Sequence, residues 1–106
     1  MGFKTIARAT VSAANTATRI TAAETSPTTR IAASTVILQS PTDGSTIWVG
    51  DASVASSPTP RGSCLIAGTF LTLPVIANSP NAYNLADIYF ASTVSTAKIN
   101  VTYVEG

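Results

Sequence analysis

The chain has 106 residues, of which 45% are hydrophobic and only 10% are charged, and its formal net charge is +1. A chain of this length is expected to form one domain with a thin core. One cysteine and no histidine exclude an internal disulfide and a Cys/His metal site. The lysines and arginines do not cluster, which argues against a nucleic-acid-binding protein. So few charges suggest that another protein covers part of the surface.

The first thirty residues are rich in alanine and threonine and poor in large apolar side chains. Two extended pieces, 5–12 and 18–23, flank an alanine-rich segment at 13–16. Its β-branched neighbours and missing caps argue against a helix. We predict that residues 1–30 form an extended N-terminal arm, or an edge region, that becomes ordered against a neighbour.

From Ile31 onward the sequence predicts short strands separated by turns. β-branched and aromatic residues favour a pleated, half-buried backbone, and turn signals recur about every ten residues. The loop at 56–62 is expected because its prolines cannot join a regular ladder. The predicted strands are, in chain order, 31–39, 46–49, 63–66, 69–73, 87–92 and 98–104.

The connections between these strands suggest hairpins. Residues 41–44, Pro-Thr-Asp-Gly, have the chemistry of a tight turn between the first two strands. In the last strand Ile99, Val101 and Tyr103 alternate with polar residues, which predicts a half-buried antiparallel strand. We expect 87–92 and 98–104 to form a C-terminal hairpin. The predicted fold class is all-β, an antiparallel, jelly-roll-like β-sandwich over 31–106 that follows the arm.

The sequence contains no pattern typical of an active site. The five carboxylates are isolated along the chain, and Asp43 and Asp51 are expected to form turns. There is no Gly-x-Ser-x-Gly elbow and no phosphate-binding glycine loop. Cys64 lies in an apolar strand and is predicted to be buried. We therefore expect a protein that is not an enzyme and needs no cofactor or metal.

No stretch of the sequence is long and apolar enough for a signal peptide or a membrane span. The single cysteine fits synthesis in a reducing cytoplasm. The sequon Asn100-Val101-Thr102 is therefore interpreted as a fragment of a strand rather than a glycosylation site.

Four aromatic side chains allow two interpretations. Tyrosine and tryptophan are enriched at protein interfaces because they bury a large area and keep a polar group. They also form platforms on which sugars stack. Trp48 and Tyr89 lie on the strand faces opposite their apolar neighbours. They could therefore belong to a protein interface or to a sugar-binding platform. The residues concerned are Trp48, Tyr83, Tyr89 and Tyr103.

Four segments, 46–54, 62–73, 87–91 and 97–103, together form a more specific pattern. A Val-Gly-Asp strand end is followed by a Leu-x-x-Gly turn, an Ile-Tyr pair and a terminal Val-Thr-Tyr. This resembles small virion proteins of tailed bacteriophages, including capsid decoration, or cement, proteins. The resemblance covers about 30–104. The chain departs from the pattern at Pro58-Thr59-Pro60 and in its longer N-terminal region.

The resemblance implies a β-sandwich that forms a homotrimer on the outer surface of a phage head, after synthesis in the host bacterium. It would clamp neighbouring capsomers, with other copies of itself and the major capsid protein as partners and no nucleic acid or membrane. Deleting residues 1–23 would then weaken capsid attachment more than folding. The alternatives are a glycan- or receptor-binding fibre or head module, and a head–tail joining or tail protein.

The candidate interface residues are the large or charged residues of the predicted arm and the aromatic residues of the second strand faces. They are Phe3, Ile6, Arg8, Val11, Arg19, Ile20, Trp48, Tyr83 and Tyr89.

Overall fold

The computed structural model describes residues 2–42, 44–57, 59–79 and 82–105. Asp43, Pro58, Pro80 and Asn81, expected in turns and loops, lie outside the described residues. The described chain is all-β, apart from a short 3-10 helix at Leu85–Asp87, and its strands form antiparallel sheets, as predicted.

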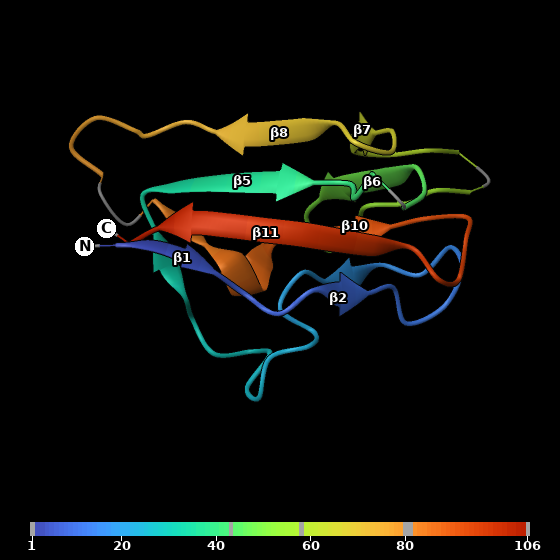
Figure 1. Ribbon diagram of the computed structural model, residues 1–106, viewed down its shortest axis with the longest axis horizontal. Coiled ribbons are helices and arrows are strands. Elements are labelled where there is room, and N and C mark those ends of the chain that lie inside the picture. Colours follow the sequence, from blue (N-terminus) through green and yellow to red (C-terminus); the bar gives the residue numbers. More distant parts are fainter. Residues whose placement is uncertain (1, 43, 58, 80–81, 106) are drawn as a thin grey trace.

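Two sheets pack face to face, and Figure 1 shows one in front of the other. Sheet I has the order β1-β11-β5-β8, and β2 also pairs with β11. Sheet II has the order β3-β10-β6-β7. The strands of sheet I are β1 (Phe3–Thr5), β2 (Ala9–Thr10), β5 (Thr35–Gln39), β8 (Phe70–Leu73) and β11 (Lys98–Val104). Those of sheet II are β3 (Thr18–Arg19), β6 (Ile47–Gly50), β7 (Ser63–Leu65) and β10 (Tyr89–Ala91). A small third sheet joins β4 (Ala32–Ala33) to β9 (Tyr83–Asn84).

The chain crosses between the two sheets six times, after β2, β3, β5, β7, β8 and β10, and the crossings after β3 and β8 pass through the small third sheet. This connectivity is that of a jelly roll. The two predicted hairpins are therefore wrong, because β5 and β6, like β10 and β11, lie in opposite sheets. Buried hydroxyls stabilise the crossings: Ser40 Oγ donates to the Ser45 carbonyl at 2.7 Å, and Ser92 Oγ donates to the Thr46 carbonyl at 2.8 Å.

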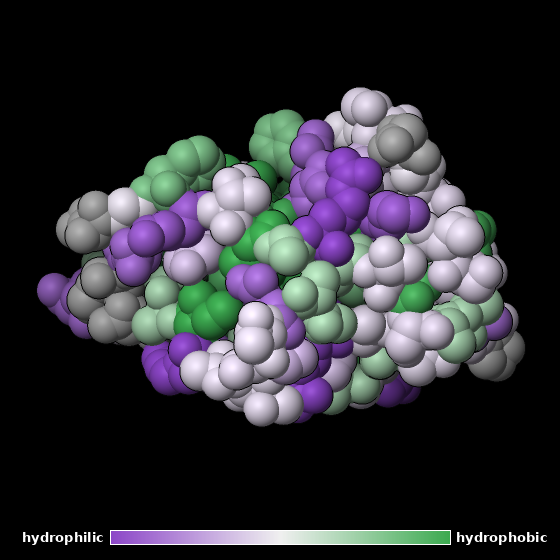
Figure 2. All heavy atoms as spheres, turned by 60° about the horizontal axis from the view of Figure 1, so that its bottom comes forward, coloured by the Kyte–Doolittle hydropathy of each residue, from purple (hydrophilic) through white to green (hydrophobic). Residues whose placement is uncertain are grey.

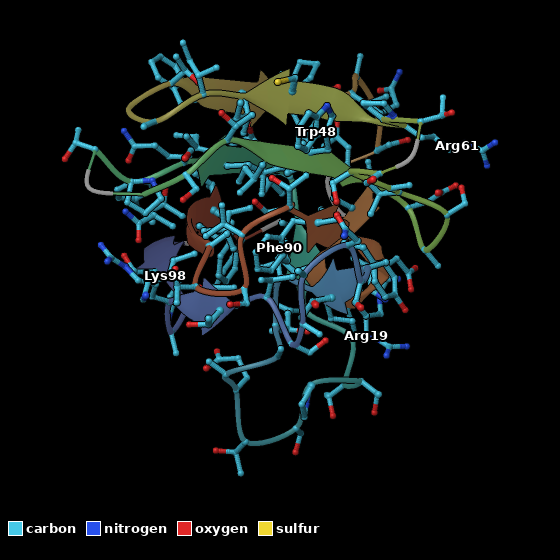
Figure 3. All side chains as sticks on the ribbon, turned by 90° about the vertical axis from the view of Figure 1, so that its right-hand side faces the viewer. Arg19, Trp48, Arg61, Phe90 and Lys98 are labelled. Atoms are coloured by element: carbon cyan, nitrogen blue, oxygen red, sulfur yellow. The ribbon has the colours of Figure 1, made fainter. Side chains whose placement is uncertain are left out.

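The core lies between the sheets. Phe90 is fully buried there, and Figure 3 shows it between the two layers. Ile99 and Val101 are buried and Tyr103 packs against the core, so the alternation predicted for the last strand is confirmed. Gly62 has φ +126°, and a Cβ there would lie 2.6 Å from the Val49 carbonyl oxygen. Only glycine can occupy this position, where the backbone just before β7 comes close to that of β6.

Residues 2–30 do not form an extended arm. They supply β1, β2 and β3, which are edge strands of both sheets. Ile6, Val11 and Ile20 are buried in the core. Of the two predicted alternatives, the arm is wrong and the edge region describes these residues, because a few buried anchors, set among small residues, are enough to fix short strands against β11 and β10.

Candidate protein-binding surface

Most of the exposed large apolar side chains lie around β8. Of the six that the described residues contain, four lie between positions 66 and 76. Their exposed fractions range from 47% to 65%. Because single-domain proteins rarely leave such side chains grouped in water, this region is a candidate surface for binding protein. The four residues are Ile66, Phe70, Val75 and Ile76.

The same region carries no charge. From Gly62 to Ala86 the sequence contains no lysine, arginine, aspartate or glutamate. β8 pairs with β5, and its other edge has no partner strand in the described part of the chain. Edge strands are usually protected from pairing by charged side chains. The β8 edge has no such protection, so it can accept a strand from another molecule.

A pocket of about 290 Å³ lies between the sheets beside this edge. Its apolar lining comes from both sheets, and Asp51 and Asp87 add two carboxylates. An apolar pocket with a few polar groups is a typical binding site, and here the polar groups favour a cation. The lining residues are Leu38, Val49, Gly50, Asp51, Ser63, Leu71, Leu73, Asp87 and Ile88.

Asp51 is held in its charged form. Ser53 Oγ donates to Asp51 Oδ1 at 2.6 Å, and the Ser53 amide donates to the same oxygen at 2.9 Å. These bonds, the side-chain bond first, together with the charge of Arg61, hold the pKa of Asp51 below its ordinary value of 3.8. The pocket therefore keeps this negative charge in mildly acidic solution.

Titration of Asp51 should show this effect directly. We expect an NMR midpoint for its carboxyl carbon below 3.8, and a midpoint closer to 3.8 in Ser53→Ala, which lacks the donating hydroxyl. Because the pKa is lower in the folded chain, the stabilisation is present above the unfolded pKa and is lost as the pH falls through the folded pKa. An unchanged midpoint in Ser53→Ala would show that this hydrogen bond does not set the pKa.

Three of the candidate interface residues are not on the surface. Ile6, Val11 and Ile20 are buried at 6%, 3% and 0% exposure, so their assignment to an interface is wrong. Phe3, in contrast, is 69% exposed on β1. Arg8 is exposed, and its Nε donates to Asn100 Oδ1 at 2.9 Å.

The remaining candidates are half-buried. The guanidinium of Arg19 lies 5.1 Å from the centre of the Tyr89 ring, and its Nε donates to the Ala86 carbonyl at 3.2 Å. The Tyr83 hydroxyl donates to the Pro74 carbonyl at 2.6 Å. Trp48 pairs with Ala91 and with Cys64 across sheet II. The structure thus brings Arg19 and Tyr89 together, whereas Tyr83 belongs to β9 of the third sheet.

Cys64 is exposed, so its predicted burial is wrong. It lies on β7, the edge strand of sheet II, where only the side chain of Leu65 reaches the core.

The sequence interpretation also missed the exposed side chains around β8. The signal that could have located them is the run of 25 uncharged residues from Gly62 to Ala86.

The described residues contain no group of histidine, cysteine or acidic side chains that could hold a metal ion. Within the same ranges, no helix is long and apolar enough to cross a membrane.

Comparison of the chain with protein-family models, with curated proteins and with solved structures finds no match. The basis for inferring a function is therefore the fold and the surface around β8.

Proposed function

We propose that this chain is a structural protein of a bacteriophage virion, which decorates and stabilises the capsid by binding the major capsid protein as a homotrimer. The observation that carries the proposal is the uncharged, apolar surface around the free edge of β8. Such a surface is unfavourable on an isolated protein in water and is expected to be covered in an assembly.

The fold and composition support the same proposal. Jelly rolls occur in viral capsid domains, although they also occur in lectin domains, so the fold alone does not decide. A charge content of 10% suits a protein that is covered on several sides. The strand and turn pattern over about 30–104 resembles that of phage decoration proteins.

Binding to empty capsid shells tests the proposal. Shells of the phage that encodes the chain, prepared without this protein, should retain it in co-sedimentation. Val75→Asp/Ile76→Asp places two charges on the apolar surface, and we expect shell binding to weaken by about ten-fold or more. The unfolding midpoint should stay unchanged, because both side chains are exposed.

Val94→Asp is the matched control, because Val94 is also exposed but lies outside positions 66–76. It should bind shells like the unaltered chain. Failure of the unaltered protein to bind shells at any concentration would overturn the proposal, whatever its mass in solution.

A second candidate function is glycan binding, and the position of Trp48 favours it. Trp48 pairs with Ala91, and Tyr89 lies two residues away on β10, so both rings belong to the same face of sheet II. Diagonal neighbours in a sheet are about 7–8 Å apart, which aromatic rings can span. Binding to a glycan array that is lost in Trp48→Ala would support this function in place of capsid decoration.

A further inference from the structure

The β1 edge of sheet I and the pocket beside β8 carry opposite charges. Lys4 lies on β1 and Arg8 follows it, with the carboxylate of Glu105 3.7 Å from Lys4 Nζ. β8 itself is uncharged, but Asp51 and Asp87 line the pocket beside it. Figure 1 shows β8 and β1 at opposite edges of the sheet. Figure 2 shows this side of the molecule, where hydrophilic groups are scattered among pale and hydrophobic ones.

Each edge also presents unused backbone groups at two alternate residues. The Ser40 amide donates to the Thr69 carbonyl at 3.1 Å, so alternation along the ladder turns the N–H and C=O groups of Phe70 and Thr72 toward the free edge of β8. On β1, the Glu105 amide donates to the Gly2 carbonyl at 3.0 Å, so Gly2 faces β11. By the same alternation, the N–H and C=O groups of Phe3 and Thr5 face the free edge of β1.

We propose that β1 of one copy adds to β8 of a second copy and places Lys4 in the pocket that Asp51 and Asp87 line. The pairs β1–β11, β11–β5 and β5–β8 are all antiparallel, so a copy in a similar orientation presents β1 antiparallel to β8. This proposal rests on the self-association in the proposed function and does not require capsid binding.

Lysine chemistry fits this pocket. With Phe3 opposite Thr72 and Thr5 opposite Phe70, Lys4 comes opposite Leu71, whose side chain lines the pocket. The methylene stem of a lysine packs on apolar side chains while its ammonium group reaches a carboxylate. Within its own chain Lys4 Nζ is 3.7 Å from Glu105 Oε1, in a pair that is about half exposed on both sides. Such a pair contributes little and is easily exchanged.

The contact is head to tail, and charge argues for this arrangement. Pairing β8 with β8 of a second copy would bring the carboxylates of two pockets toward each other, which is unfavourable. Pairing β8 with β1 brings Lys4 toward the carboxylates of the pocket instead. Head-to-tail contacts between identical subunits generate a closed ring when the rotation allows, and a ring of three fits the proposed homotrimer.

Sedimentation analysis of near-isosteric variants tests the proposal. Asp51→Asn/Asp87→Asn removes both charges and keeps an oxygen that can accept the bonds from Ser53. Lys4→Gln removes the charge of the other edge. We expect each variant to raise the self-dissociation constant about ten-fold or more. Lys98→Gln is the matched control, because Lys98 lies on β11, which is paired with strands on both sides, and its Nζ donates to the Thr96 carbonyl. It should leave the constant unchanged.

Mixing the two edge variants decides the arrangement. Lys4→Gln keeps an intact pocket, and Asp51→Asn/Asp87→Asn keeps an intact Lys4, so a mixture contains one native contact and should form a 1:1 heterodimer. A contact between like edges predicts no preference for the heterodimer over the homodimers, and the absence of this preference would overturn the proposal. A wild-type chain that stays monomeric at every concentration would also overturn it, whereas shell binding by that monomer would leave the capsid assignment standing.

Discussion

Removal of residues up to Ala23 is expected to unfold the domain. The segment supplies β1, β2 and β3 and buries Ile6, Val11 and Ile20 in the core. Burial of an isoleucine- or valine-sized side chain contributes about 1.5–3 kcal/mol, so the three together contribute about 4.5–9 kcal/mol. That is comparable with the whole stability of a small domain, about 5–15 kcal/mol. Circular dichroism and chemical denaturation should show no cooperative transition in the truncated chain.

Phe3→Ala is the control for this truncation, because Phe3 lies in the same segment but is 69% exposed. It should change the free energy of unfolding by less than about 1 kcal/mol. A truncated chain that still unfolds cooperatively, and loses only binding to shells, would show that the segment is an arm after all.

Phe90→Ala is expected to cost about 3–5 kcal/mol of folding stability. The ring is fully buried between the sheets, and its removal leaves a cavity in addition to the lost transfer free energy. Denaturant unfolding should be measured in a Lys4→Gln background, so that self-association does not add to the apparent stability.

The matched control is Phe70→Ala, which makes the same chemical change at a side chain that is 65% exposed. Its cost should stay below about 1 kcal/mol, because little surface is removed from water at this position. Equal losses at Phe90 and Phe70 would contradict the assignment of the core to the space between the sheets.

The candidate site was only partly accessible from sequence. The charge-poor composition predicts a covered surface, which stays a prediction, and of the candidate interface residues Phe3 is 69% exposed. The pocket was not predictable, because its lining comes from five segments that are separated in the chain, represented by Leu38, Val49, Ser63, Leu71 and Ile88. The exposure of Phe70 could not be predicted from the sequence either. An apolar residue in a strand pattern is expected to face a core, but Phe70 lies on the outer face of β8, opposite to the face from which Leu71 and Leu73 line the pocket.

The sequence by itself determined the all-β class and the positions of the main strands, because the two-residue period and the turn residues are local properties of the chain. The alternation from Lys98 to Val104 is the clearest case. Tertiary structure decided which sheet each strand joins. A half-buried strand shows the same alternation whether the chain turns back beside it or crosses to the opposite sheet, so β5–β6 and β10–β11 could not be recognised as crossings. It also decided that the small residues at the start of the chain complete the edges of both sheets, since burial there depends on β10 and β11, which come about seventy or more positions later in the sequence.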